Sequence, residues 1–108
     1  MTASEKEFLA KYERWIDWHK TNPKIWVYFK RFALVAAKSK RVSVSHWLII
    51  NRIRWEVSVA TKGGDFKISN DYIAFYARLW KAAYPALDYL FTTKTMKGEM
   101  DMNYLEAL

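Results

Sequence analysis

The sequence predicts a mainly α-helical, compact domain of four or five helices, and three observations support this expectation. Glycine and proline are scarce, at 3 and 2 of 108 residues, which argues against a turn-rich β-sandwich and against disorder. Hydrophobic residues make up 52% of the chain, enough to fill one core of ordinary size. Apolar residues recur at spacings of three and four along most of the chain, which is the period of helices that bury one face.

The first two predicted helices meet at an Asn-Pro pair. Ser4 and Glu7 have the spacing of a capping box, so the first helix is expected to start there and to end before the pair. Asn22 is a favourable N-cap, and Pro23 suits a first helical turn because its missing N–H would have no partner there. The second helix is therefore predicted from Pro23 to about Lys38, joined to the third by a tight turn.

The third helix and the segment after it leave two interpretations open. Ser43 or Ser45 can cap this helix. From Trp55 onward, alternating apolar and polar residues flank the Gly-Gly pair at 63–64, which favours a two-stranded hairpin that turns at the glycines. In the other interpretation the helix continues to about Ala60 and a loop follows, because no helix breaker interrupts the run. The β-branched valines favour strands, and the Gly-Gly turn signal, which a long helix would not require, tips the expectation slightly toward the hairpin.

The fourth predicted helix completes the domain. It is expected to begin at Ser69 or Asn70 and to end before Pro85, with a last turn packed on the core. Residues 1–93 should form this single domain, and 94–108 should form an acidic C-terminal tail that is free to move. The expected core comprises apolar residues on the helical stripes: Phe8, Trp15, Trp26, Phe29, Ile50, Ile53, Tyr76, Leu79 and Trp80.

Charge is the compositional feature that points to a binding partner. Lys and Arg total 18 against 11 Asp and Glu, a net charge of +7, which is typical of proteins that bind polyanions. The lack of cysteine excludes disulfides and favours an intracellular location. We expect a cytoplasmic protein with no membrane contact, because the sequence shows neither a secretory signal nor an apolar run long enough for a span.

Two helices followed by a hairpin have the outline of a winged helix-turn-helix, which predicts binding to double-stranded DNA, with dimerisation a natural companion. Arg and Asn fit base edges, whereas Ser and Lys also contact phosphates. The candidate nucleic-acid-binding residues are Lys38, Lys40, Arg41, Ser43, Ser45, Asn51, Arg52, Lys62 and Lys67. In the alternative interpretation, Arg52 and Arg54 form ion pairs with Glu56 or Asp71, and the apolar residues beside them belong to the core.

A second function class is a module that binds a host protein or a copy of itself. Aromatic residues make up 18% of the chain, and Trp, Tyr and Arg are the usual anchors of protein interfaces. Trp47 lies on a predicted core stripe. Phe75 is predicted to lie outside these stripes, and so are Trp18, Tyr28 and Trp55. The candidate partner-binding residues are Trp18, Tyr28, Leu48 and Trp55.

The sequence offers little for catalysis. His19 and His46 do not have the spacing of a metal-binding pair, and a lone histidine beside an apolar stripe is usually structural. The Gly-Gly pair does not extend into a phosphate-binding loop. We therefore expect no enzyme activity, no metal and no cofactor.

Five short motifs follow one another between about residues 8 and 93: NPKIW, RVSVSHW, IRWE, DFKISNDY and FYARLW. In this order and spacing they resemble a family of small proteins from phages, prophages and bacteria. The resemblance implies a phage or mobile-element origin and a role in the bacterial cytoplasm, on DNA or on a host protein. It assigns no catalytic or binding residue to this chain.

Overall fold

A computed structural model of the chain describes residues 1–39, 44–60 and 68–99. Within these ranges the chain forms four α-helices and one 3-10 helix, and no strand. The elements are α1 (Ala3–Thr21), α2 (Pro23–Lys38), α3 (His46–Ala60), α4 (Asn70–Ala83) and η1 (Pro85–Leu90). The prediction of a mainly α fold with four or five helices is therefore confirmed. No helix in the described ranges is both long enough and apolar enough to cross a membrane.

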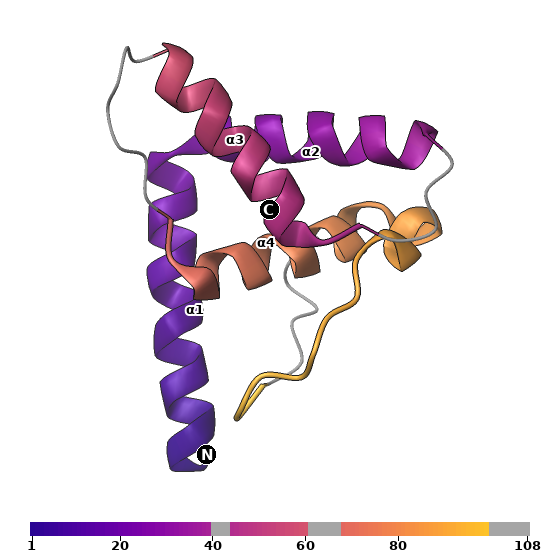
Figure 1. Cartoon of the computed structure of the whole chain (residues 1–108). Helices are drawn as coiled ribbons and strands as arrows, with labels where there is room; N and C mark the ends of the chain where they lie inside the picture. The colour runs from indigo at the N-terminus through magenta and orange to yellow at the C-terminus, as the bar shows by residue number, and fades with distance from the viewer. Residues whose placement is uncertain (40–43, 61–67, 100–108) are drawn as a thin grey trace.

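Helix α4 is the central element of the fold. It contacts α1, α2, α3 and η1, and Figure 1 shows α2 above it and α1 running past one of its ends. Because it has neighbours on several sides, α4 buries residues around most of its circumference. The prediction that Phe75 lies outside the core is wrong for this reason. The buried residues of α4 are Ile73, Phe75, Tyr76, Ala77, Leu79 and Trp80.

Aromatic rings fill the interior between α1, α2 and α4. The ring centroids of Trp15 and Tyr76 lie 5.3 Å apart, with the planes nearly perpendicular. Eight of the nine predicted core residues are buried, and Trp26 is half-buried against the Tyr76 ring. Trp47 is 41% exposed, so its predicted core position is wrong. It lies in the first turn of α3, where Ile49 and Ile50 occupy the inward positions instead.

The ends of α1 are fixed by local hydrogen bonds. The capping box forms at Thr2 and Glu5 rather than at Ser4 and Glu7: Thr2 Oγ1 accepts from the Glu5 N–H, and the Thr2 N–H donates to Glu5 Oε1. These bonds lower the pKa of the Glu5 carboxyl. The sequence contains two overlapping Ser/Thr-x-x-Glu patterns, and the earlier one gives the longer helix.

A single residue, Asn22, separates α1 from α2. Its backbone N–H donates to carbonyls of the last turn of α1, and its side-chain amide donates to the Trp18 carbonyl at 2.9 Å. The prediction that its side chain caps the start of α2 is wrong. With no other residue in the junction, the amide satisfies the end of α1, and Pro23 starts α2 without needing a partner for its nitrogen.

Helix α3 continues to Ala60, which contradicts the predicted hairpin and, with it, the wing. Ile50, Ile53 and Val57 follow one another at spacings of three and four, and all three pack into or against the core. This long-range packing overrides the strand preference of the β-branched residues. The glycine pair at 63–64 lies outside the described residues.

The segment that follows η1 returns along α4 to the start of α1, as the yellow trace in Figure 1 shows. Arg78 of α4 holds it, because its Nε lies 2.6 Å from Glu99 Oε1 and its Nη2 donates to the Lys94 carbonyl at 2.7 Å. Gly98 has a φ of 73°, and a Cβ at this position would lie 2.1 Å from the Ser4 carbonyl oxygen. Residues 94–99 of the predicted tail therefore contact α1 and α4, and 100–108 lie outside the described residues.

Candidate functional site

An open groove of about 650 Å³ lies between α2 and α3. Figure 1 shows α3 crossing α2 obliquely, and the residues that line the groove come from the second half of α2 and from the first three turns of α3. Phe32 and Ala36 of α2 are half-buried and Ile49 of α3 is buried, so these side chains form the floor. Val35 and Leu48 stand at the groove with exposed fractions of 62% and 50%. The groove is therefore apolar in its floor and at part of its rim.

The exposed apolar side chains of the molecule are concentrated on the same two helices. Seven large hydrophobic residues of the described ranges are exposed, and five of them belong to α2 or α3. Isolated exposed hydrophobics are common on monomeric proteins, but a concentration on one pair of adjacent helices indicates an interaction surface. The five residues are Val27, Val35, Trp47, Leu48 and Trp55.

Two arginines line the groove and rest on aromatic rings. The Arg52 guanidinium lies 5.2 Å from the Phe32 ring centroid, and that of Arg31 lies 6.0 Å from the Tyr28 ring centroid. The rings of Tyr28 and Phe32 are nearly parallel, at an interplanar angle of 5°. Arg52 Nε also lies 3.3 Å from Glu56 Oε1, which confirms one of the alternative ion pairs. Both ends of this pair are more than a third exposed, so solvent screens it and Arg52 can exchange partners at little cost.

Four of the nine candidate nucleic-acid-binding residues lie within the described ranges, and all four are exposed. Ser45 Oγ accepts from the Trp47 N–H at the start of α3, and Asn51 Oδ1 accepts from Arg54 at 3.4 Å. Arg52 is at the groove, and Lys38 is the last residue of α2. The remaining five candidates are outside the described residues: Lys40, Arg41, Ser43, Lys62 and Lys67.

Most of the connection between α2 and α3, where a tight turn was predicted, lies outside the described residues, but its length is given by the bounds of the two helices. Seven residues, 39–45, separate the two helices, whereas a helix-turn-helix motif has a turn of about three or four. At the end of the connection the Val44 N–H donates to the Leu90 carbonyl at 2.7 Å, which ties the start of α3 to η1. Together with the missing wing, this spacing removes the two features that defined a winged helix-turn-helix.

The four candidate partner-binding residues do not form one patch. Leu48 and Trp55 of α3 are exposed, at 50% and 65%, which rules out the alternative that they belong to the core. Tyr28 is half-buried beneath Arg31. Trp18 of α1 packs on α4, with its ring 5.4 Å from that of Tyr72.

Val27, Phe32 and Val35, which complete the surface on α2, are not among the candidates predicted from the sequence. A signal for the two valines was present, since they stand at helical spacing among basic residues rather than on the apolar stripe that contains Ile25 and Phe29.

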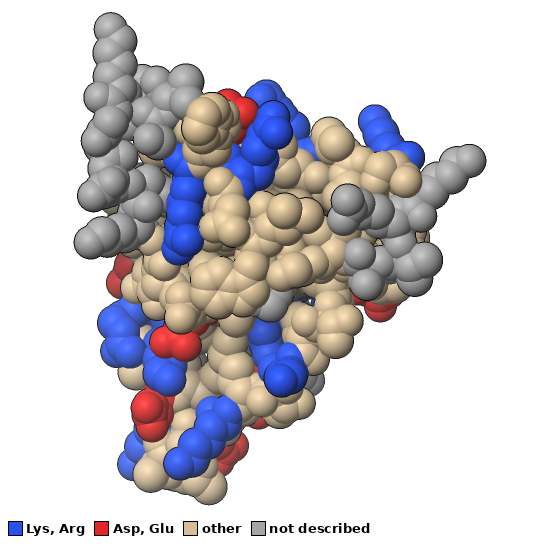
Figure 2. Space-filling view, in the orientation of Figure 1, with Lys and Arg blue, Asp and Glu red and all other residues tan. Residues whose placement is uncertain are grey.

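Charge is distributed unevenly between the helices. In the sequence, α2 and α3 together contain six basic residues and one acidic residue, whereas α1 contains four of each. Figure 2 shows blue and red side chains intermingled along α1 in the lower part of the view, and mainly blue ones toward the top, where α2 and α3 lie. The net charge of residues 22–60 is +7, equal to that of the whole chain.

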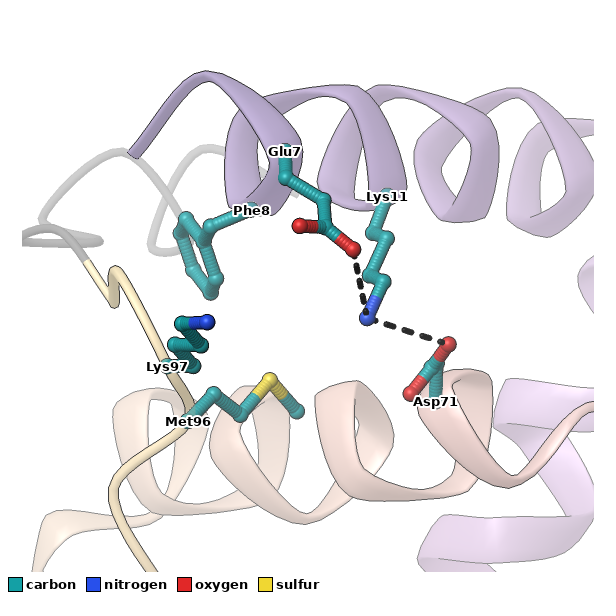
Figure 3. Close-up of a pocket in the computed structure, with 6 residues that line it drawn as sticks. All are labelled: Glu7, Phe8, Lys11, Asp71, Met96 and Lys97. Carbon is teal, nitrogen blue, oxygen red and sulfur yellow. Dashed lines mark ion pairs between the residues drawn. The ribbon is translucent and has the colours of Figure 1, made fainter. Parts of the chain in front are cut away.

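A second, smaller hollow of about 240 Å³ lies where the segment after η1 meets α1 and α4 (Figure 3). Lys11 projects between two carboxylates, with its Nζ 3.8 Å from Glu7 Oε1 and 4.0 Å from Asp71 Oδ2. Phe8 and Met96 supply the apolar wall. Lys97 adds a second basic side chain, so the hollow is lined by two basic and two acidic residues and has no net charge that would select a ligand of either sign.

A buried histidine forms the polar contact inside the core. His19 is 9% exposed and stacks on Trp15, and its Nδ1 lies 3.0 Å from the Tyr76 hydroxyl oxygen. Burial lowers the pKa of His19, and Lys20 adds to the effect. Burial also raises the pKa of the Tyr76 hydroxyl. The arrangement agrees with a structural role for His19. It also predicts that the stability of the folded protein decreases at acidic pH.

We expect the free energy of unfolding to be constant between about pH 7 and pH 9 and to fall as the pH drops below about 6.5. In that range the unfolded chain binds a proton on His19 that the folded state disfavours, so stability rises with pH. Urea unfolding at several pH values would measure this dependence. The dependence should be weakened in His19→Gln; an equal dependence in wild type and His19→Gln would contradict the prediction.

Comparisons with family models, with curated proteins and with solved structures found no match for this chain. The fold and the site define a small helical domain with an open, apolar and basic groove on one pair of helices. The function is therefore inferred from that groove and the surface around it.

Proposed function

We propose that this chain is a binding module that docks on another protein through the surface formed by α2 and α3. The observation that supports this proposal is the concentration of exposed apolar side chains on these two helices, beside the groove. Protein interfaces combine a desolvated apolar centre with Arg and aromatic anchors. Leu48 and Val35 supply apolar contacts, and Arg31 and Arg52 supply anchors that are already supported by aromatic rings.

Replacing Leu48 with glutamate should weaken docking at least about 30-fold, because the change removes an apolar contact and puts a charge at the apolar rim. Loss of one interface anchor typically costs about 2 kcal/mol, or roughly 30-fold in affinity. The experiment is capture of partners from a nuclease-treated bacterial lysate, with wild type and L48E side by side. Tyr89→Glu is the matched control, since Tyr89 is equally exposed, at 50%, but lies on η1. A partner that L48E and wild type retain equally would contradict the proposed surface.

A second candidate function, binding of double-stranded DNA, is favoured by a different observation. Ser45, Asn51 and Arg52 are exposed at or along α3, within the segment that contains the excess positive charge. Residues of these types contact base edges and phosphates. In this case α3 would have to act without a wing, and affinity would come mainly from phosphate contacts.

If DNA is the ligand, affinity should fall steeply with salt, because each phosphate contact releases counterions. Replacing Lys40, Arg41 and Arg52 together with alanine should reduce the slope of log K against log salt by up to about three. Mobility-shift titrations on mixed duplexes at several salt concentrations would measure this slope. The absence of any shift at low salt would eliminate DNA binding as a function.

A further inference from the structure

One exposed stripe of α2 alternates basic and apolar residues in a regular order. Lys24, Val27, Arg31, Val35 and Lys38 follow one another at spacings of three, four, four and three, which places them along one side of the helix. All five are exposed, the two valines at 51% and 62%. We call these five residues the α2 stripe. Its basic residues recur every seven positions, or about 10 Å along the helix axis.

The α2 stripe borders the groove, since Arg31 and Val35 belong to both. A helix lying along α2 would cover the two valines and press against Phe32 and Leu48 in the groove. Helices that pack side by side match residues in a repeat of seven. A partner helix with acidic residues seven positions apart would therefore meet Lys24, Arg31 and Lys38 in turn, with its apolar residues against the valines.

Charge argues against a second copy of this chain as the occupant. If two α2 stripes paired antiparallel about Arg31, Arg31 would face its own copy and Lys24 would face Lys38. A parallel pairing in register would also place each basic residue against its equivalent. Like charges held opposite each other in an interface are destabilising, and α2 contains no acidic residue to offset them.

The valines argue against a nucleic acid on this stripe. A phosphate backbone would pair with the three basic residues, but it offers nothing apolar to Val27 and Val35. Their exposure is explained by an occupant that has an apolar face as well as negative charge.

We propose that the α2 stripe and the adjoining groove bind an amphipathic helix of a partner protein that presents acidic residues at seven-residue spacing beside an apolar face. This inference rests on the proposed function, and it names the chemistry of the partner.

Three synthetic helical peptides would test the proposal by titration against the full chain. The acidic probe places Glu at three positions seven residues apart, with Leu between them on the same face. The scrambled probe has the same composition with its Glu residues distributed around the helix, and the basic probe has Lys in place of Glu. We expect the acidic probe to bind at least tenfold more tightly than the scrambled one, and the basic probe not to bind.

Variants of exposed residues would show whether the acidic probe binds at the α2 stripe. Arg31→Glu should weaken binding of the acidic probe at least tenfold and should allow the basic probe to bind. Val35→Ser should weaken binding of the acidic probe, and the basic probe should still not bind. Arg14→Glu is the matched control, because Arg14 is also exposed but lies on α1, and the change should affect the binding of neither probe. Circular dichroism of each variant confirms that it is folded.

Three outcomes would overturn the proposal. Equal binding of the acidic and scrambled probes would show that binding does not depend on the seven-residue spacing of the acidic residues. Binding that depends on Arg31 but not on Val35 would indicate a general polyanion site, as for DNA. Sedimentation showing a dimer that Arg31→Glu dissociates would make a second copy the occupant. The proposed function has its own, separate test: it is contradicted if capture of the natural partner does not depend on Leu48.

Discussion

Replacing Trp15 with alanine is expected to lower the free energy of unfolding by about 3–5 kcal/mol, the usual cost of removing a large aromatic side chain from a packed core. Trp15 has no exposed surface. Its ring lies 5.4 Å from that of Phe75 and 5.3 Å from that of Tyr76, both on α4, so the side chain joins α1 to the central helix. Because a domain of this size is stable by only about 5–15 kcal/mol, the loss is a large part of the total.

Urea unfolding followed by far-ultraviolet circular dichroism would measure the effect of Trp15→Ala. Trp55→Ala is the matched control, because the same side chain is removed from a position that is 65% exposed. The control should change the free energy of unfolding by less than about 0.5 kcal/mol. Equal losses in the two variants would show that α1 is not anchored through Trp15.

The helices that the sequence predicted correctly have strong local signals. Pro23 starts α2, and Ser69 caps α4 by accepting from the Asp71 N–H. These signals act within one helical turn, so they do not depend on the rest of the fold. The start of α1 was predicted two residues late, because two capping patterns overlap and local rules do not distinguish them.

The hairpin was predicted wrongly because its decisive contacts are long-range. Residues 55–60 have alternating polarity, but Val57 also continues the inward spacing of Ile50 and Ile53. In the folded chain the helical spacing of these three residues prevails over the alternating polarity, since it buries a continuous apolar face of α3. Contacts between α3 and α4 then stabilise the helix, and these contacts join residues far apart in the sequence.

The candidate site could be predicted only in part for the same reason. The excess positive charge and the outward positions of Leu48 and Arg52 follow from the sequence. The groove does not, because it exists only where α3 crosses α2 and leaves Phe32 and Val35 beside Leu48.

The two pairs of helices have different roles in the structure. Helices α1 and α4 bury the aromatic core, and α1 balances its charges, whereas α2 and α3 combine excess positive charge with exposed apolar surface. This division favours protein docking over a purely electrostatic role, because exposed Val35 and Leu48 lower solubility without strengthening contact with phosphates.

Replacing Arg78 with methionine should destabilise the packing of residues 92–99 by about 2–3 kcal/mol, since the change leaves a shielded carboxylate without its partner. The Arg78 side chain is only 10% exposed and that of Glu99 is 23% exposed. Besides the ion pair, Arg78 Nη1 donates to the Ala74 carbonyl and Nη2 to that of Lys94. The guanidinium therefore ties the returning segment to α4 through two contacts, with Glu99 and Lys94, while its bond to Ala74 fixes it on its own helix.

Hydrogen exchange of the Glu99 amide, which donates to the Met96 carbonyl, would measure this effect, with a rate increase of about 30-fold or more expected in Arg78→Met. Adding Glu99→Gln should recover part of the loss, because the unpaired charge is then removed while the bond to Lys94 stays broken. Arg78→Lys should be intermediate, since a lysine keeps the charge but lacks the planar fork that reaches two carbonyls and a carboxylate together. Unchanged exchange in Arg78→Met would show that Gly98, seated against the first turn of α1, holds the segment by itself.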